Sequence, residues 1–226
     1  MKTALCFQHV PFEGPGVFQG CLEKREFAIH KILVPSQGVP KDLPDLLLVM
    51  GGPMSVNDAD PWIAHEQRYI RRAIDSDIPV LGICLGSQLI TKTLGGDVKP
   101  GPRLEIGPVP IALTVEEDTD PVFGTFPPTL EVFQWHGEGL TLPPGAILLA
   151  SSQHFPVQAF RYGERVYGLI FHLELETEGV KALCRECSGD VVKAGTTTDA
   201  LLEGASRVLH QSHELADRLI AHLTSP

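Results

Sequence analysis

The stretch VLGICLGSQL, residues 80–89, places a cysteine between two glycines at the end of an apolar run. A predicted strand precedes Cys84 and a predicted helix follows it. This is the G-x-nucleophile-x-G pattern of a nucleophile elbow, a sharp turn that holds a reactive side chain at the top of a sheet. The N-terminus of the following helix favours a thiolate at that point. The alternative for these ten residues is a buried core cysteine, and the other motifs bear on the choice.

A cysteine nucleophile requires a base, and GLIFHLELE, residues 168–176, supplies a candidate. His172 follows an apolar strand, and Glu174 comes two residues later. In an extended chain these two side chains point the same way, so the Glu174 carboxylate can orient the imidazole. Functional residues of parallel sheets lie at the carboxyl ends of the strands, so His172 and Cys84 are expected at one edge. By itself, His172 would be expected to face solvent at a strand end.

Acyl transfer has a third requirement, stabilisation of the oxyanion. A glycine pair that directly follows a predicted strand suits it, in LLLVMGGPMSV at residues 46–56. The developing oxyanion needs backbone N–H groups aimed at it, and glycine permits a close backbone approach. The expected donors are the amides of Gly52 and Leu85. An ordinary turn before Pro53 is the alternative explanation of the pair.

Alternating strands and helices position these motifs. Short apolar runs predict strands buried on both faces, with a helix at 60–77 that begins at Asp60–Pro61 and another at 85–96. The strand runs are 3–10, 27–34, 45–50 and 78–83. Strands separated by helices in this rhythm predict a parallel sheet with right-handed crossovers.

The second half of the chain has a different pattern. Strands separated by turn residues predict an antiparallel stretch that leads back to one more central strand, at 165–171. The runs are 106–115, 129–136, 145–152, 155–162 and 165–174. The tail, about 197–226, is predicted to be helical because apolar side chains recur on one helical face. That face comprises Leu201, Ala205, Val208, Ser212, Leu215, Leu219 and Leu223.

Composition and charge narrow the classes of protein. The net charge of −10 opposes a nucleic-acid surface, which needs clustered Lys and Arg. No apolar run approaches the ~20 residues of a membrane span, and MKTALCFQHV reaches polar residues too soon for a signal peptide. We therefore expect a cytoplasmic protein that binds neither nucleic acid nor membranes. Five cysteines at irregular spacing do not indicate a disulfide framework, and the lone CREC of Cys184 and Cys187 is a weak metal or redox signal.

Together, the three motifs resemble the class I glutamine amidotransferases, whose triad is Cys-His-Glu. The resemblance rests on LLLVMGGPMSV as the oxyanion loop, GICLGSQ as the elbow and FHLE as the H-x-E segment, in the family's order. VFQWHGEGLTLPPGAILLASS, residues 132–152, is similar to stand-alone members of the GMP-synthase-like branch. The resemblance covers roughly residues 1–187 and implies an α/β, flavodoxin-like doubly wound fold. Its mostly parallel sheet would have helices on both faces and a small antiparallel insertion, in one domain spanning 1–226.

The resemblance also implies an activity, hydrolysis of the glutamine side-chain amide to glutamate and ammonia, with no metal or cofactor. It assigns the nucleophile to Cys84, the base and later acid to His172, and the orienting carboxylate to Glu174. Two further residues, Gln88 and His136, would line the substrate pocket, although His136 could equally be a turn residue.

Two features separate this chain from most relatives. Leu173 stands where the family usually has proline, and leucine is compatible with the same extended segment. The chain also shows no ATP-using synthetase motif, so we expect either a separate synthetase subunit that accepts the ammonia or a different substrate. The alternative substrate class is a γ-glutamyl amide or peptide, hydrolysed at the same site. A non-catalytic regulatory protein on this fold is the third possibility.

Overall fold

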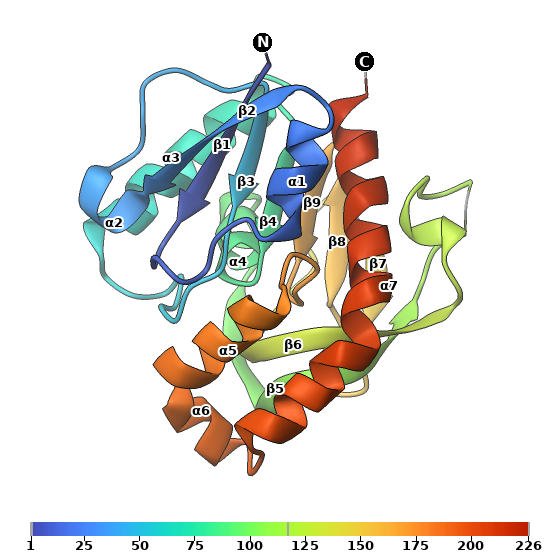
Figure 1. Ribbon diagram of the computed structural model, residues 1–226. Helices are drawn as coiled ribbons and strands as arrows, with labels where there is room; N and C mark the ends of the chain where they lie inside the picture. Colours follow the sequence, from blue (N-terminus) through green and yellow to red (C-terminus); the bar gives the residue numbers. More distant parts are fainter. Residues whose placement is uncertain (1, 117, 226) are drawn as a thin grey trace.

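The computed structural model describes residues 2–116 and 118–225. Its strands are β1 Lys2–Gln8, β2 Phe27–Leu33, β3 Leu46–Val49, β4 Val80–Ile83, β5 Val98–Leu113, β6 Thr129–Leu140, β7 Ala146–Ser151, β8 Ala159–Tyr162 and β9 Val166–Leu169. Its helices are α1 Val17–Glu23, α2 Val34–Gln37, α3 Pro61–Asp75, α4 Leu85–Thr93, α5 Thr177–Glu186, α6 Ser188–Lys193 and α7 Thr198–Thr224, with a 3-10 turn at Phe123–Thr125. Within the described residues the strands form one sheet in the order β2-β1-β3-β4-β9-β8-β7-β5-β6 (Figure 1).

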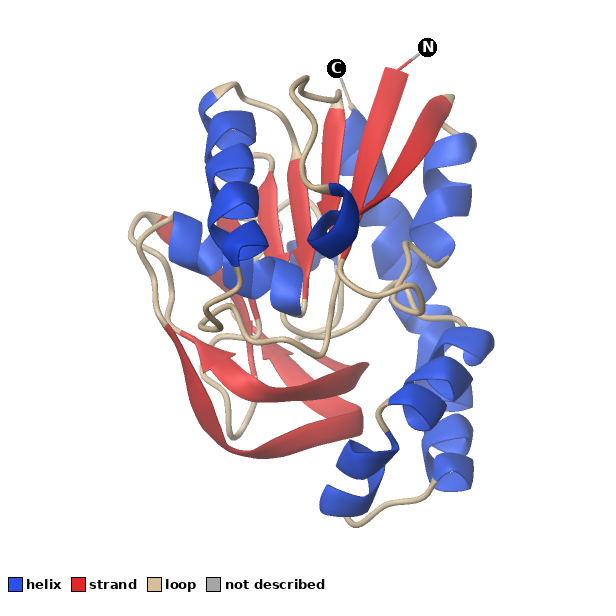
Figure 2. Ribbon diagram, turned by 90° about the vertical axis from the view of Figure 1, so that its left-hand side faces the viewer, coloured by secondary structure: helices blue, strands red, loops and turns tan. Residues whose placement is uncertain are grey.

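The first part of the sheet is parallel and covered on both faces. β2, β1, β3, β4 and β9 pair in parallel, with α1 and α7 packed on one face and α3 and α4 on the other (Figure 2). Because helices cover both faces, every residue of β3, β4 and β9 is buried. The predicted doubly wound α/β fold is confirmed.

One of the predicted strands is not buried on both faces. β2 lies at the edge of the sheet, and most of its residues are half-buried or exposed. The expectation for residues 27–34 was wrong because an apolar composition does not reveal where in the sheet a strand lies.

The second part of the sheet is antiparallel and continues directly from β9. From β9 the sheet continues through β8 and β7 to β5 and β6, and the β5–β6 pair lies below the parallel strands in Figures 1 and 2. β5 starts at Val98, eight residues before the predicted start at 106, and its register with β6 shifts between Pro100 and Glu105. The predicted strand at 155–162 is shorter than expected and begins at Ala159.

The long helix α7 joins the two parts. Its C-terminal half packs on α1 and the parallel strands, whereas its N-terminal half packs on α5 and β6. All seven residues of the predicted apolar face are buried, which confirms that face. Among the described residues no helix is both long enough and apolar enough to span a bilayer.

Candidate active site

Cys84 lies at the turn between β4 and α4, in the conformation that an elbow requires. Its φ of 50° and ψ of −110° are unusual for a residue with a side chain, and such strain is held only by the surrounding structure. Both flanking glycines are required by space. A Cβ on Gly82 would lie 2.6 Å from the backbone of Gly86, and one on Gly86 would lie 2.0 Å from the carbonyl oxygen of Val49. The predicted elbow geometry is therefore present.

His172 and Glu174 form a buried pair behind the cysteine. Nδ1 of His172 lies 2.7 Å from Oε1 of Glu174, and the two residues are 1% and 3% exposed. The backbone N–H of His172 donates to the carbonyl of Phe133 on β6, which fixes the segment beyond β9. Nε2 of His172 has no hydrogen-bond partner in the described part of the chain. The solvent-facing alternative for His172 is wrong.

The charge state of His172 depends on its neighbours. Burial alone lowers the pKa of His172, but the Glu174 carboxylate and the adjacent Cys84 outweigh burial and raise that pKa well above its usual value. An imidazolium is therefore stable beside the cysteine, and a proton taken from the thiol can stay on the ring.

The glycine pair after β3 lies against the elbow. A Cβ on Gly51 would lie 2.1 Å from Oε2 of Glu13, and one on Gly52 would lie 2.9 Å from Cβ of His9 and 3.0 Å from Cδ2 of Leu85. Within the described residues, the N–H groups of Gly52 and Leu85 donate no hydrogen bond. The N–H groups of both predicted oxyanion donors are thus without an acceptor in this part of the chain, and their role stays a prediction.

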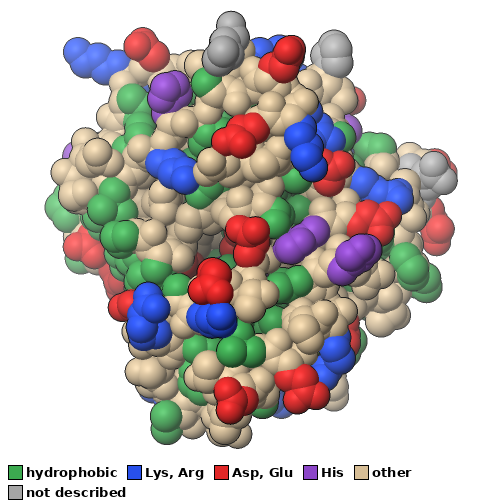
Figure 3. All heavy atoms as spheres, in the orientation of Figure 1, with side chains coloured by type: hydrophobic (Ala, Val, Ile, Leu, Met, Phe, Trp, Pro, Cys, Tyr) green, Lys and Arg blue, Asp and Glu red, His purple; other side chains and the backbone are tan. Residues whose placement is uncertain are grey.

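A cavity of about 210 Å³ opens in front of the cysteine. It is lined by the glycine loop, the elbow, β5, β6 and the α5–α6 region, and Figure 3 shows a hollow on this face with acidic side chains near its rim. The predicted residues that line it are Gly52, Cys84, Gln88, His136 and His172. The cavity therefore collects residues from both parts of the sheet.

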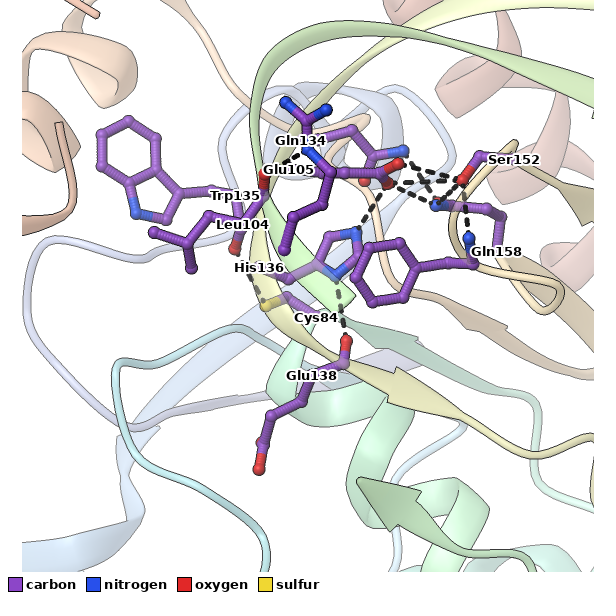
Figure 4. Close-up of polar contacts among 11 residues, drawn as sticks. Cys84, Leu104, Glu105, Gln134, Trp135, His136, Glu138, Ser152 and Gln158 are labelled. Carbon is purple, nitrogen blue, oxygen red and sulfur yellow. Dashed lines mark hydrogen bonds and ion pairs between the residues drawn. The ribbon is translucent and has the colours of Figure 1, made fainter. Parts of the chain in front are cut away.

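The two predicted substrate-binding residues lie in this cavity. Gln88 is 4% exposed, and its Oε1 has no partner among the described residues. His136 belongs to strand β6, so the turn alternative is wrong. Its Nδ1 donates to the carbonyl of Glu138 at 2.9 Å, and its Nε2 lies 3.4 Å from Oε2 of Glu105 (Figure 4).

Glu105 is one of the residues that sequence reasoning missed. Burial raises the pKa of this carboxyl, but His136, Ser152 and Gln158 outweigh burial and lower it, so Glu105 is ionised beside the imidazole. Ser152 and Gln158 donate to the carboxylate at 3.1 and 2.8 Å. No local motif marks Glu105, because its partners come from β6 and from the segment between β7 and β8.

Glu13 was also missed, and it lies inside the cavity. It is 8% exposed, and burial raises its pKa to about 7, although the nearby His172 acts in the opposite direction. The only sequence signal is its place in a Gly- and Pro-rich loop, FEGPG. Its carboxyl group can therefore change charge near neutral pH beside the candidate nucleophile.

The CREC pair has no metal-site geometry in the described residues, where no group of three or more His, Cys, Asp or Glu side chains could hold an ion. Cys184 is buried in α5, while Cys187 follows the helix and lines the cavity. Burial and nearby carboxylates raise the pKa of Cys187 to about 11, so its thiol stays protonated at neutral pH.

Comparisons with known proteins agree with this geometry. Residues 21–210 match the family model of glutamine amidotransferase class-I. The chain is 34% identical over 194 residues to the putative glutamine amidotransferase-like protein YfeJ of Salmonella typhimurium, covering 82% of this chain and 81% of YfeJ. It is 32% identical over 158 residues to the glutamine-hydrolyzing GMP synthase of Latilactobacillus sakei, covering 67% of this chain but 29% of that synthase.

A solved structure extends the likeness to the whole chain. The crystal structure of a glutamine amidotransferase from Thermotoga maritima superposes with a TM-score of 0.90 at 28% identity, covering 99% of each chain. The family model covers most of the chain, and the expected stand-alone, GMP-synthase-like relatives are found. This chain belongs to the class I glutamine amidotransferase family.

Proposed function

We propose that this protein hydrolyses the side-chain amide of glutamine to glutamate and ammonia through a thioester on Cys84. His172 takes the thiol proton as the sulfur attacks the amide carbon, which gives a tetrahedral oxyanion. The N–H groups of Gly52 and Leu85 donate to that oxyanion. Collapse breaks the C–N bond, and His172 returns the proton to the departing ammonia.

Water completes the cycle. His172 removes a proton from a water molecule that attacks the thioester, and the second tetrahedral intermediate releases glutamate and the Cys84 thiol. Glu174 transfers no proton in either half of the reaction. It holds the imidazole in one tautomer and stabilises the imidazolium. Besides glutamine and water, the proposed reaction uses only side chains and amides of this chain.

One observation carries the proposal. The ring of His172 uses Nδ1 to bind Glu174 at 2.7 Å, while its Nε2 has no hydrogen-bond partner among the described residues, and His172 lines the same cavity as the strained Cys84. A histidine oriented on one side and free on the other is the arrangement a general base requires. Gln88 and His136 are proposed to bind the amino-acid part of the substrate.

The fate of the ammonia is a second part of the proposal. The match to the glutamine-hydrolyzing GMP synthase of Latilactobacillus sakei spans 158 residues, which is 29% of that longer protein. We therefore propose a separate synthetase subunit as the ammonia acceptor, with weak glutaminase activity in its absence. A cytoplasmic location stays a prediction.

A specific feature of the cavity favours a second candidate, hydrolysis of γ-glutamyl conjugates. Glu13, Glu138 and Asp190 line the cavity, and none of the described lining residues is Lys or Arg. An acidic lining attracts a cationic group, so an amide formed with an amine-bearing leaving group would be favoured over glutamine.

Glutamate release by the purified protein separates the two candidates. The panel contains glutamine, a neutral γ-glutamyl peptide and a γ-glutamyl conjugate of a diamine, with Cys84→Ala as the matched control. Turnover of glutamine that disappears in the control supports the first candidate. Faster turnover of the diamine conjugate supports the second, and no release from any compound contradicts both.

A further inference from the structure

A second buried histidine–glutamate pair lies on the far side of the glycine loop and has no part in the proposed reaction. Nε2 of His9, just beyond β1, lies 3.2 and 3.1 Å from the two carboxylate oxygens of Glu66 on α3. Both side chains are fully buried. Nδ1 of His9 lies 3.0 Å from the carbonyl oxygen of Gly51. The His9–Glu66 pair is therefore hydrogen-bonded, through His9, to the backbone of the predicted oxyanion loop.

The hydrogen bonds define the charge of this histidine. With Glu66 ionised, its carboxylate and the Gly51 carbonyl are acceptors only, so both ring nitrogens of His9 donate and the ring is an imidazolium. Burial alone lowers the pKa of His9, but the Glu66 carboxylate outweighs it and raises that pKa. The other groups around the ring are Glu13, whose charge also favours the imidazolium, and Trp62, whose ring centroid lies 5.1 Å away.

The contact controls the direction of one amide. The carbonyl of Gly51 and the N–H of Gly52 belong to the same planar trans peptide unit and point in opposite directions. Holding the oxygen at His9 therefore aims the N–H of Gly52 away from His9. A donor on the carbonyl also polarises the peptide and makes its N–H a stronger donor.

Steric contacts also restrict the same peptide. Cβ of His9 and Cδ2 of Leu85 lie close to Gly52, as the 2.9 and 3.0 Å contacts of a substituted Cβ show. On Gly51, the Glu13 carboxylate occupies the equivalent space. Rotation of the peptide would break the hydrogen bond between His9 and the Gly51 carbonyl.

We propose that His9 and Glu66 are positioning residues that hold the Gly51–Gly52 peptide with its N–H directed at the oxyanion. The proposal rests on the proposed function, because an oxyanion forms only if an amide is attacked. Stability alone does not account for the pair, since a buried ion pair is often no more stabilising than apolar residues of similar size. Its position at the oxyanion loop gives it a catalytic consequence.

The test uses Glu66→Gln and His9→Leu in the full-length protein, with glutamine turnover as the first readout. Loss of one oxyanion donor costs roughly 10²- to 10³-fold in kcat, so a displaced donor is expected to cost about 10- to 100-fold. KM should change little, because the ground-state amide does not depend on the oxyanion donors. His9→Asn places an amide donor near the same carbonyl and should recover part of the lost kcat.

Two further readouts separate positioning from general damage. Binding of the γ-aldehyde analogue of glutamine, which forms a tetrahedral adduct with Cys84, should weaken by the same factor as kcat. Alkylation of Cys84 by iodoacetamide should keep its rate, because that displacement forms no oxyanion. Tyr167→Phe is the matched control: its buried hydroxyl donates to Asp120 at 3.1 Å outside the cavity, so it should lower the melting temperature and leave kcat unchanged.

The outcomes also distinguish this inference from the proposed function. If the wild type hydrolyses glutamine and both variants keep the wild-type kcat, this inference is overturned while the proposed function stands. Equal losses of kcat and of alkylation rate overturn it too, because they indicate a damaged nucleophile. If the wild type releases no glutamate, the proposed function fails, and the affinity for the γ-aldehyde analogue decides this inference. Weaker aldehyde binding by the variants than by the wild type supports the positioning role. Equal binding by the variants and the wild type, or no binding by the wild type, overturns it. If Glu66→Gln does not fold, the difference between His9→Leu and His9→Asn decides.

Discussion

The regions around His172 and His9 contain the same chemical pair in two different settings. Each histidine is buried beside a glutamate, and the distances are 2.7 Å to Glu174 and 3.1 Å to Glu66. Within the described chain, one ring nitrogen of His172 has no hydrogen-bond partner, and His172 lines the cavity that holds the candidate nucleophile. His9 uses both ring nitrogens. A buried His–Glu pair is thus equipped for proton transfer only where one nitrogen is free, and otherwise it fixes the backbone.

The largest expected effect is at the free nitrogen. His172→Ala removes the only base proposed for Cys84, and we expect glutamate release to fall by roughly 10⁴-fold or more. Iodoacetamide labelling of Cys84 should slow as well, in contrast to the His9 variants. Steady-state kinetics and labelling rates are the measurements. If His172→Ala retained substantial turnover, the two histidines would no longer differ in role.

A smaller loss is expected when the orienting carboxylate is removed. Glu174→Ala leaves Cys84, His172 and the amide donors in place, so its kcat should stay about two orders of magnitude above that of His172→Ala. The buried imidazolium also loses its main stabilising charge, which lowers the pKa of His172. The acidic limb of the kcat/KM profile should therefore move to lower pH. Full activity in this variant would show that Glu174 does not orient the ring.

Glu13 lies between the two pairs and should affect stability with pH. Its folded pKa of about 7 exceeds the ordinary value of 4.5, so the folded protein holds this proton more tightly than the unfolded chain does. The resulting stabilisation of the folded state is fully present below pH 4.5 and is lost as the pH rises through 7. The free energy of unfolding of Glu13→Gln should thus exceed that of the wild type by up to about 3 kcal/mol near pH 8 and should equal it near pH 4. Denaturant unfolding at both pH values checks this; equal stabilities at high pH would contradict it.

The smallest effect on turnover is expected from substituting Leu173, the residue between His172 and Glu174. Leu173 is fully buried in the core, but its N–H makes no hydrogen bond in the described structure. Leu173→Pro should therefore cost about 2 kcal/mol through lost packing and leave kcat nearly unchanged. Melting temperature and turnover measure the two effects. Complete unfolding, or loss of turnover in a folded variant, would show that the segment is not extended as the H-x-E pairing requires.

The sequence determined the features whose geometry is local. The elbow at Cys84, the glycine pair and the H-x-E segment each span a few residues, so backbone stereochemistry alone sets how their side chains point. The alternation of strands and helices also predicted the parallel part of the sheet and the apolar face of α7. These motifs were sufficient to place Cys84, His172 and Gly52 around one cavity.

Only the tertiary structure decided contacts between distant segments. Glu66 is 57 residues from His9, and Glu105 pairs with His136 across two strands whose register shifts at Pro100, so no spacing in the chain predicts either contact. The edge position of β2 and the early start of β5 likewise follow from which strands pair, not from composition. The physical reason is that local dihedral preferences act over a few residues, whereas burial and hydrogen-bond pairing between distant elements are settled when the whole core packs.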